Sequence, residues 1–461
     1  MTKYRSVIRS ILYPAFQKLK GRSTMSLLKR WERLHLEPEE EIDQFQFQCL
    51  RDIIQHAYDQ VPFYRRSFNL HGLDPGDLRA LEDIQKIPLL TKSDVKENLS
   101  QFLASQAQEP MKIVRTGGST GEPMKYFMGQ DAFAANQAVL WRSRRWHGLD
   151  IGQPNILIWG HSESLQGGIK GHMATWTRPL KDRILNRWTF SAYDLSEQKL
   201  RRIIASLQKH HAVFLRGYAT SLYALAKYVD GRENPVDLED LRGIITTSEV
   251  LYPWQRKQIE DAFHCPVIDE YGANETGIMA YSCPEGNLHL MDENLYVEVI
   301  KDEGAGPYEL GEIVVTQLHH RSAPLIRYRI GDVALGIDRG CPCGSNLRIL
   351  KGLKGRIYDL FVTKQNDYIH AQYFTHLLRQ SEGVKKFQVI QVSREKIRIK
   401  LVLDMDPAEY STQKITRLIR DMMGEDIEIE YMYVDHIPVE ESGKYRWIVS
   451  EVQHNLLESE R

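Results

Sequence analysis

The sequence predicts an α/β protein with a large N-terminal domain and a small C-terminal α+β domain. Three observations lead to this fold class. From Lys112 to Gly272, short apolar runs alternate with stretches of helical period, the pattern of a largely parallel sheet covered by helices. Residues 288–338 change to short strands with turns, typical of a β-rich subdomain. The final stretch of about 100 residues has the composition of a separate α+β unit of common domain size.

The first part of the large domain, residues 1–110, is predicted to be helical. "EEEIDQFQFQCLRDIIQHAYDQVPFYRRSF" has apolar positions at spacings of three and four and is interrupted at Pro62. In "LLTKSDVKENL", Thr91 or Ser93 is placed to cap a charged helix. Helices are therefore expected on both sides of Pro62 and after the cap.

The alternating region can be divided into individual elements. The expected strands are "KIVRT", "NILIWG", "AVFLRGY", "LRGIITTSE" and "CPVIDEYG". The expected helices are "DAFAANQAVLWRSRRWHGL", "LSEQKLRRIIASLQKH", "SLYALAKYVDG" and "YPWQRKQIEDAF". The β-rich part that follows contains "LYVEVI", "GEIVVTQL" and "LIRYRIGDVA". The large domain is predicted to end at residue 355.

The small domain is predicted to span residues 356–461. "KKFQVIQV" and "KIRIKLVLD" have the pattern of a hairpin, "PAEYSTQKITRLIRDMM" that of a helix, and "DIEIEYMYV" that of a strand. We find no internal repeat in the chain. The tail is therefore expected to fold as a compact unit.

Composition and charge exclude several classes of protein. The chain has 461 residues, of which 42% are apolar and 26% charged, an ordinary balance for a soluble globular protein. The net charge of -1 shows no bias toward nucleic acid. No apolar run reaches the length of about 18 residues expected of a spanning helix. Five cysteines, an odd and sparse set, suit a reducing cytoplasm, where we expect the protein to be located.

The N-terminal thirty residues depart from this neutral balance, because they contain basic residues and no acid. The basic residues are Lys3, Arg5, Arg9, Lys18, Lys20, Arg22, Lys29 and Arg30. Apolar residues recur there at helical spacing, at Ile8, Ile11, Leu12, Ala15, Phe16 and Leu19. Such a helix can lie on an anionic membrane surface, or it can dock on its own domain. Docking is favoured because helical amphipathicity is far commoner than membrane binding.

The stretch "RTGGSTGEP", residues 115–123, follows an expected strand and is rich in glycine and hydroxyl groups. Such a turn can surround phosphate oxygens with backbone N–H groups and side-chain donors. It is not a Walker loop, because Glu122 and Pro123 stand where that motif needs glycine and lysine. Taken alone, an ordinary surface turn explains it equally well.

Four further motifs follow in order. They are "EYGANETG" (270–277), "RYRIGDVA" (327–334), "GRIYDL" (355–360) and "PVEESGKYR" (438–446). With the glycine-rich stretch, this set resembles the adenylate-forming superfamily of acyl-CoA ligases, in particular the phenylacetate–CoA ligase-like branch that includes capsular polysaccharide synthesis proteins. The similarity extends from about residue 45 to residue 450 and is specific because five modest motifs occur in the family's order.

The resemblance implies a nucleotide site. The phosphates of ATP would be held by Thr116, Gly117, Gly118, Ser119, Thr120 and Gly121, although the family usually has a hydroxyl residue where this chain has Gly117. Glu275 would hold Mg²⁺. Asp332 would accept the ribose hydroxyls, and Arg356 would add a ribose or phosphate contact. The adenine would lie against Ser248, Glu249, Glu270, Tyr271 and Gly272.

The resemblance also implies the chemistry. Lys444 would be the lysine that stabilises the charge formed when a carboxylate attacks the α-phosphate of ATP and pyrophosphate leaves. Asp359 falls at the family's hinge, about which the small mobile domain turns between half-reactions. Tyr358, Asn366-Asp367 and Ala371-Gln372 depart from the family pattern in the segment that governs the second half-reaction. These departures leave CoA as the acceptor less certain than ATP as the substrate.

The pocket for the acid is expected near Trp159, Arg216, Tyr218 and Ala273. Arg216 and Tyr218 are polar groups within an apolar segment, which is unusual. An equally good alternative is that Arg216 pairs with a core acid. His161 and His172 lie in a glycine-rich stretch that could cover the site, but such histidines are more often ordinary surface residues.

A structural zinc site is expected from four residues in two short motifs. "CPEGNLH" contains Cys283 and His289, and "CPCG" contains Cys341 and Cys343. Four nitrogen and sulfur ligands suit tetrahedral Zn²⁺ and would leave no open position for catalysis. The alternative is a set of buried thiols beside an unrelated histidine. Cys49 and Cys265 are expected to be buried and inert.

The sequence thus predicts an ATP- and Mg²⁺-dependent enzyme that converts a carboxylic acid into an acyl-adenylate and passes the acyl group to CoA. One alternative delivers the acyl group to an amine or hydroxyl of a sugar or peptide. Another is a non-catalytic nucleotide-binding relative, which the presence of Glu275, Asp332, Arg356 and Lys444 disfavours. The identity of the acid, a homodimer and a membrane contact through the N-terminus stay open.

Overall fold

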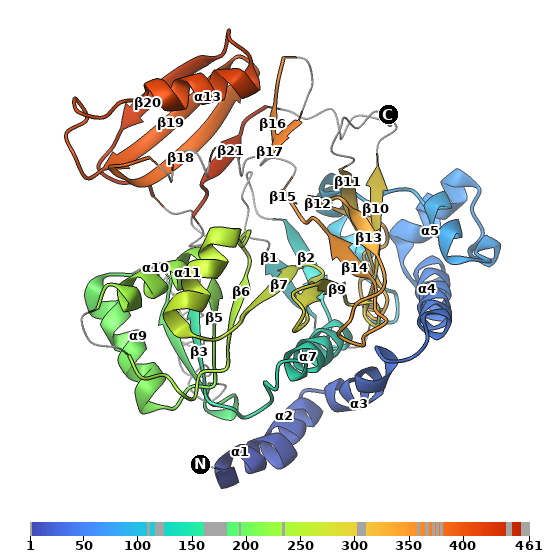
Figure 1. The fold of residues 1–461 in the computed structure, drawn as a ribbon. Helices are drawn as coiled ribbons and strands as arrows, with labels where there is room; N and C mark the ends of the chain where they lie inside the picture. The colour runs from blue at the N-terminus through green and yellow to red at the C-terminus, as the bar shows by residue number, and fades with distance from the viewer. Residues whose placement is uncertain are drawn as a thin grey trace. The chain divides into compact units, whose positions relative to one another are not determined.

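The computed structural model describes most of the chain, and its residues divide into two compact units (Figure 1). The first unit comprises residues 1–298, 313–330 and 336–351, and the second comprises residues 299–312, 331–335 and 352–461. The description leaves out residues 1, 108–110, 116–123, 161–181, 193–194, 233–235, 302–309, 357–359, 365–367, 371–373, 375–377, 379–380, 439–444 and 453–461. The domain boundary expected after residue 355 stays a prediction.

The first unit is built on a sheet with the strand order β13-β14-β9-β8-β7-β6-β5-β3-β4. One half is parallel: β3 (Asn155–Trp159), β4 (Arg187–Ser191), β5 (Phe214–Tyr218), β6 (Gly243–Thr247) and β7 (Val267–Ala273). The other half is antiparallel: β8 (Gly277–Ser282), β9 (Leu288–Leu290), β13 (Gly336–Asp338) and β14 (Ile349–Lys351). The predicted α/β fold is confirmed, and an antiparallel extension continues the parallel strands.

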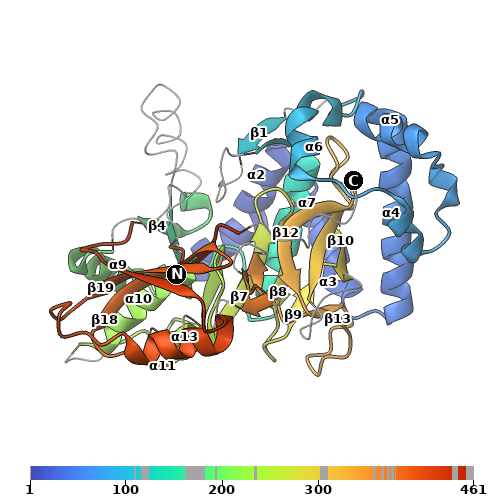
Figure 2. The same ribbon diagram turned by 90° about the horizontal axis from the view of Figure 1, so that it is seen from above.

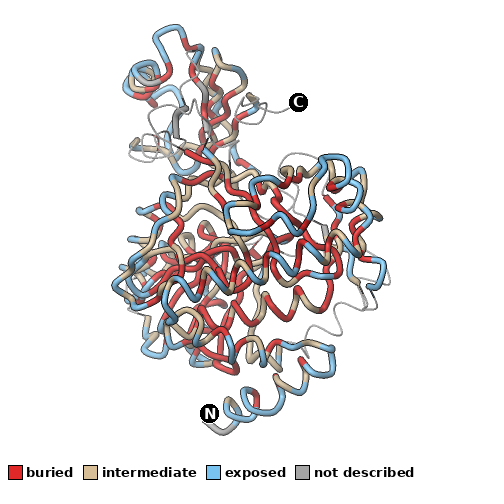
Figure 3. Tube along the Cα trace, turned by 90° about the vertical axis from the view of Figure 1, so that its right-hand side faces the viewer, coloured by how far each residue is buried: buried red, intermediate tan, exposed pale blue. Residues whose placement is uncertain are grey.

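Helices cover both faces of the parallel strands, because each strand carries apolar side chains on both sides. On one face, Leu215 and Ile244 pack against α9 (Glu197–Lys209), α10 (Ala219–Asp230) and α11 (Pro253–Phe263). On the other face, Phe214 and Ile245 belong to the cluster formed with α7 (Gln130–Arg145). The buried positions of the first unit follow these strands and the helix sides that face them (Figure 3).

The N-terminal part of the first unit is helical, as predicted. Its longer helices are α1 (Thr2–Val7), α2 (Tyr13–Leu19), α3 (Thr24–Leu34), α4 (Glu39–Gln60), α5 (Pro62–His71) and α6 (Lys92–Glu97). Short turns are η1 (Ile8–Leu12), which is π-helical, and the 3₁₀ turns η2 (Pro75–Asp77), η3 (Leu81–Lys86) and η4 (Leu99–Phe102). Thr91 caps α6 by accepting a hydrogen bond from the Asp94 amide, and Pro62 starts α5. Figure 2 shows α4 and α5 next to each other at the edge of the first unit.

The docked face of the first two helices differs from the expected one. Ile8 is buried as expected, but the other buried residues are Tyr13 and Gln17. Ile11, Leu12 and Leu19 are exposed. The reason is the π-helical turn, in which the Tyr13 amide donates to the Ile8 carbonyl five residues earlier. Ile8 and Tyr13, five residues apart, therefore lie on the same buried face of the helix. A search with the period of a regular α-helix misses this five-residue spacing.

Two smaller groups of strands complete the region. A hairpin pairs β1 (Lys112–Arg115) with β2 (Lys125–Met128), with Arg115 opposite Lys125. A further sheet contains β10 (Leu295–Lys301), β11 (Gly311–Gln317) and β12 (Tyr328–Ala334), and the division between the units falls within these strands. Among the described residues, no helix is long and apolar enough to span a bilayer.

The C-terminal part of the second unit is the predicted α+β structure. Its sheet has the order β20-β19-β18-β21 and consists of β18 (Val384–Ser393), β19 (Lys396–Leu403), β20 (Glu428–Tyr433) and β21 (Ile448–Ser450). The expected hairpin is the antiparallel pair β18–β19. Smaller strands are β15 (Gly355–Arg356), β16 (Leu360–Val362) and β17 (Tyr368–His370). Helix α13 (Gln413–Met423) begins later than predicted, because Asp406 and Pro407 form turns with Ala408 and Tyr410.

We expect Leu215→Ala to lower the free energy of unfolding by about 2–5 kcal/mol, because Leu215 is fully buried between the sheet and α10. Urea denaturation followed by circular dichroism measures this change. Lys209→Ala, at the exposed end of α9, is the control and should change the value by less than about 0.5 kcal/mol. Equal effects of the two substitutions would contradict the packing described for this face.

Candidate functional site

The carboxyl ends of the parallel strands gather most of the predicted site residues of the first unit. Trp159 ends β3, Tyr218 ends β5, Ser248 follows β6 and Ala273 ends β7. Parallel register brings these ends to one edge of the sheet. Open α/β sheets bind their ligands outside this edge. The edge is therefore the candidate functional site.

Trp159, Arg216 and Tyr218 form one contact group at this edge. The rings of Trp159 and Tyr218 have centroids 4.8 Å apart. The Arg216 guanidinium lies 4.9 Å from the centre of the Trp159 ring, a cation–π distance. The Tyr218 hydroxyl accepts a hydrogen bond from the Gly160 amide at 3.2 Å. Three of the four residues predicted to line an acyl pocket are thus joined through contacts with Trp159.

Arg216 is also paired with an acid of the core. Its Nη2 donates to Oε1 of Glu270 at 2.5 Å, and Glu270 is buried. Burial alone would raise the pKa of Glu270, but Arg216 and Arg144 together lower it. The alternative weighed for Arg216, an ion pair with a core acid, is therefore present. One carboxylate oxygen of Glu270 is used in this ion pair and is not available to bind adenine. The predicted contact between Glu270 and adenine stays a prediction.

The strand ends carry two unusual backbone positions. Ser248 has φ of 68°, a left-handed conformation that is rare for residues other than glycine and recurs at functional sites. At Gly272, where β7 is bulged against β8, a Cβ atom would lie 2.5 Å from the Gly277 carbonyl oxygen.

Glu249, which follows Ser248, is held by Thr220, whose amide donates to the Oε2 atom of Glu249 at 2.8 Å.

Glu275 lies in the turn after β7 and is nearly buried. The Tyr328 hydroxyl lies 3.4 Å from its Oε1, and Gln317 donates to its backbone carbonyl at 2.9 Å. The Tyr126 hydroxyl donates to the carbonyl of Asn274 at 2.5 Å. Burial and the nearby Glu275 charge both raise the pKa of Tyr126. These contacts hold the carboxylate at the edge of the sheet.

Tyr126 connects this turn to the glycine-rich stretch. The residues of the predicted phosphate loop, Thr116 to Gly121, lie outside the described residues. Their flanking strands β1 and β2 are described, and Tyr126 belongs to β2. The stem of the glycine-rich stretch therefore lies beside the Glu275 turn. Sequence reasoning missed Tyr126 and Tyr328, because nothing in the chain order relates them to Asn274 and Glu275.

Other predicted residues belong to the second unit or are not described. Asp332 of β12 lies opposite Arg356 of β15 in an antiparallel pair within the second unit. Only the backbone of Arg356 is described. Lys444, Asp359, His161 and His172 lie outside the described residues. Their roles stay predictions.

The four predicted zinc ligands do converge. Their ligand atoms all lie within 4.8 Å of one another. The sulfur atoms of Cys283 and Cys341 are 3.7 Å apart, and the Cys343 sulfur is 3.3 Å from Nε2 of His289. Tetrahedral zinc with Zn–S bonds of about 2.3 Å would place two sulfur ligands about 3.8 Å apart. The donor set and its spacing fit a zinc ion.

Surrounding groups orient these ligands. Nδ1 of His289 lies 2.9 Å from the Leu347 carbonyl, so an N–H there leaves Nε2 free to face the sulfur atoms. Asn287 donates to the Cys341 sulfur at 3.2 Å. Burial opposes ionisation of Cys341, but hydrogen bonds from the Cys343 backbone and from Asn287 are among those that lower its thiol pKa. Burial raises the thiol pKa of the other two cluster cysteines, Cys283 and Cys343. It also raises the pKa of Cys49 to about 11 and that of Cys265 to about 12.

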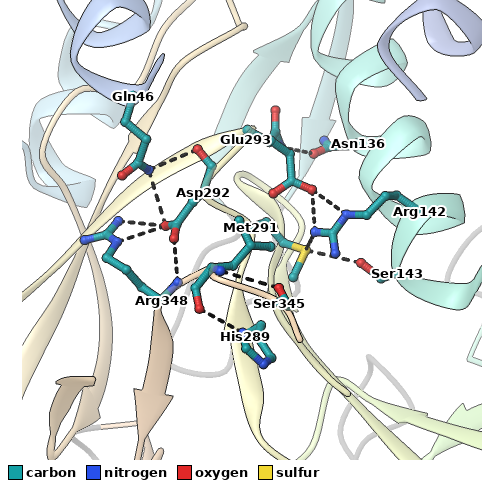
Figure 4. A network of polar contacts seen from close by, with 12 residues as sticks. Gln46, Asn136, Arg142, Ser143, His289, Met291, Asp292, Glu293, Ser345 and Arg348 are labelled. Atoms are coloured by element: carbon teal, nitrogen blue, oxygen red, sulfur yellow. Dashed lines mark hydrogen bonds and ion pairs between the residues drawn. The ribbon is translucent and has the colours of Figure 1, made fainter. Parts of the chain in front are cut away.

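A network of buried charges adjoins this cluster (Figure 4). Asp292 accepts hydrogen bonds from the Arg348 guanidinium at 2.8 Å and from Gln46 of α4 at 3.3 Å. Glu293 forms an ion pair with Arg142 of α7, and both side chains are almost inaccessible. The segment after His289 is thus tied to two helices. Charged pairs buried in this way are costly to break, so they hold this segment in place.

The chain is similar to known proteins in sequence and in fold. Residues 361–451 match the family model described as the CapK C-terminal domain. Protein CapK of Staphylococcus aureus is 23% identical over 89% of both chains. Phenylacetate-coenzyme A ligase of Escherichia coli is 24% identical over 88% of this chain and 94% of its own. A solved 2-hydroxyisobutyryl-CoA ligase in complex with 2-HIB-AMP has a TM-score of 0.71 at 20% identity and covers 91% of each chain.

The chain is thus similar to phenylacetate-coenzyme A ligases in sequence and to a solved acyl-CoA ligase in fold. The relationship confirms the resemblance inferred from the five motifs and the predicted enzyme class, an AMP-forming ligase. The solved neighbours confirm the fold, including the small C-terminal domain. The individual roles of the site residues in this protein stay predictions.

We expect Gly272→Ala to destabilise the protein by about 1–3 kcal/mol, because the added Cβ meets the backbone of β8 and forces the two strands apart. The change is measured as a fall in the free energy of unfolding. Gly231→Ala is the matched control, since Gly231 has φ of -77° and its nearest neighbour would be at 3.4 Å. A Gly272 variant as stable as the control would show that β7 and β8 are not held this closely.

Proposed function

We propose that this chain activates a carboxylic acid with ATP and Mg²⁺, releases pyrophosphate, and transfers the acyl group of the resulting acyl-adenylate to CoA. The observation that carries the proposal is the position of Glu275. Its nearly buried carboxylate lies at the carboxyl edge of the sheet, beside the stem of the glycine-rich stretch. The curated relatives named phenylacetate-CoA ligase support the reaction class.

In this proposal Glu275 is the ligand for Mg²⁺, which would offset the negative charge of the phosphates. Tyr328 and Gln317 position the Glu275 turn through its carboxylate and its carbonyl. The loop from Thr116 to Gly121 donates N–H and O–H groups to the phosphates. Asp332 and Arg356 bind the ribose. The adenine pocket is lined by Ser248, Glu249, Tyr271 and Gly272.

Lys444 is proposed to act only during adenylation. Charge builds up on the oxygens around the α-phosphate as the carboxylate attacks, and a cation close to them stabilises that transition state more than the bound substrates. A mobile small domain with its hinge at Asp359 would supply this lysine for one half-reaction and withdraw it for the other. The hinge and the motion rest on the family resemblance.

The acyl group is proposed to bind against Trp159, Tyr218 and Ala273. Arg216 contacts the Trp159 ring and forms an ion pair with Glu270, so the positive charge of Arg216 is already neutralised. An uncharged, flat or branched acyl group suits the aromatic rings better than a second carboxylate.

An amine or hydroxyl acceptor is the competing second half-reaction. The sequence departures at Tyr358, Asn366-Asp367 and Ala371-Gln372 lie in the segment that governs the second half-reaction, so they weaken the case for CoA and keep this alternative open. Pyrophosphate release from a panel of carboxylic acids, followed by analysis of the products with and without CoA, separates thioester from amide and ester products.

We expect Lys444→Ala to reduce acid-dependent pyrophosphate release at least about a hundredfold while ATP binding remains, because the lysine acts on the transition state. Turnover is measured by pyrophosphate release and ATP binding by calorimetry. Lys385→Ala removes an exposed lysine of the same unit and should leave both unchanged. Normal turnover in the Lys444 variant would refute the assigned role. A wild-type protein that binds ATP without releasing pyrophosphate for any acid would support the non-catalytic alternative.

We also propose that Cys283, His289, Cys341 and Cys343 hold a structural Zn²⁺. The convergence of these four ligand atoms supports it. Chelator-washed wild-type protein should contain about one zinc per chain, and Cys343→Ser should lose it and unfold at a lower temperature. Cys49→Ser is the control, since Cys49 is not in the cluster, and it should keep the metal. Metal-free protein with all the thiols reactive would exclude the site.

A further inference from the structure

The outward face of the N-terminal helices is apolar. The apolar side chains exposed there are Tyr4, Val7, Ile11, Leu12, Ala15 and Leu19. Leu19 is 85% exposed and Ile11 is 60% exposed. Figure 3 shows this N-terminal segment as mostly exposed, with isolated buried positions. We call these six side chains the N-terminal stripe.

The π-helical turn η1 produces the stripe. Apart from Leu12, which adjoins Ile11, the members of the stripe from Tyr4 to Leu19 recur at one spacing of three residues and then at spacings of four. The average is about 3.75 residues per turn, which exceeds the 3.6 of a straight α-helix. In a regular α-helix, residues at this wider spacing would shift a little around the helix axis with each turn, so Leu19 would no longer lie on the same face as Val7. The wider turn at Ile8–Leu12 takes up an additional residue and keeps Leu19 on the face of Val7.

The opposite face is firmly attached to the first unit. The Tyr13 hydroxyl accepts a hydrogen bond from Trp141 Nε1 at 2.9 Å, and Gln17 accepts one from Thr24 at 3.2 Å. Gly152 allows the close approach, because a Cβ there would lie 2.9 Å from the Arg5 carbonyl and 3.1 Å from the Cβ of Ile8. The stripe is therefore not an alternative docking face of the same helices, since their docked face is already in use.

Basic side chains accompany the stripe. Lys18 and Lys20 are exposed next to Leu19, and no ion pair among the described residues involves either. Arg9 is exposed but paired with Asp150 at 3.2 Å. No acid occurs before Glu32. The surface that covers the stripe must therefore accept apolar side chains and compensate positive charge.

We propose that this face binds an anionic lipid surface, with the stripe inserted among the acyl chains and Lys18 and Lys20 at the headgroups. Amphipathic helices with apolar and basic residues bind membranes in this way, reversibly and in the plane of the interface. A second copy of the chain would bring identical basic segments together, which is unfavourable. Nucleic acid would compensate the charge but would leave the apolar side chains in water.

The test uses the full-length protein and sedimentation with lipid vesicles. Wild-type protein should bind vesicles of phosphatidylcholine with phosphatidylglycerol, bind poorly to phosphatidylcholine alone, and be released by added salt. The double variant Ile11→Ser, Leu19→Ser should bind the anionic vesicles about tenfold more weakly. The double variant Lys18→Glu, Lys20→Glu should weaken binding by a similar factor.

Matched controls distinguish binding through the N-terminal stripe from non-specific binding of exposed side chains to vesicles. Leu70 of α5 is 80% exposed and lies outside the stripe, so Leu70→Ser should bind like the wild type, as should Lys209→Glu. Every substituted side chain is exposed, and thermal unfolding should be unchanged. Acid-dependent pyrophosphate release without vesicles should also be unchanged, so this test does not depend on the proposed catalysis.

Two results would overturn the proposal. One is wild-type protein that does not bind anionic vesicles, or stripe variants that bind as well as wild type. The other is a dimer in sedimentation equilibrium that dissociates in the Ile11→Ser, Leu19→Ser variant, because the stripe would then be an interface between copies of this chain.

Discussion

The parallel register of β3 to β7 is the constraint on which the candidate site depends. Parallel strands run in the same direction, so all of them end at the same edge of the sheet. Helices α9, α10 and α11 connect β4 to β5, β5 to β6 and β6 to β7. Residues that are far apart in the sequence, such as Trp159, Ser248 and Ala273, come to the same edge of the sheet for this reason. The hydrophobic packing of α7 and of α9 to α11 provides the energy that maintains the register.

The antiparallel half of the same sheet has a different role. Its strands bring the Cys/His cluster together, and the next segment anchors α4 and α7 through Asp292 and Glu293. A metal at the cluster would bind across β8, β9 and the turn between β13 and β14. The cluster and the buried charges thus stabilise the part of the first unit that lies farthest along the sheet from β4.

Local patterns predicted the elements well wherever their period was regular. The parallel strands, the helices between them and the β18–β19 hairpin agree with expectation because each buries side chains at spacings that the sequence displays. The prediction failed at η1, where a five-residue spacing replaced the usual one and exposed Ile11 and Leu19. It also placed the start of α13 too early, because turns formed by Asp406 and Pro407 compete with the helix.

By itself, the sequence determined the fold class, the ligase relationship and the four-residue Cys/His set, because ordered motifs and regular periods are local properties of the chain. Tertiary structure decided the rest. It paired Arg216 with Glu270, brought Tyr126 and Tyr328 to the Glu275 turn, and turned Tyr13 rather than Ile11 inward. These outcomes depend on contacts between residues far apart in the chain and on one π-helical turn. The energies of such contacts cannot be inferred from the local residue pattern.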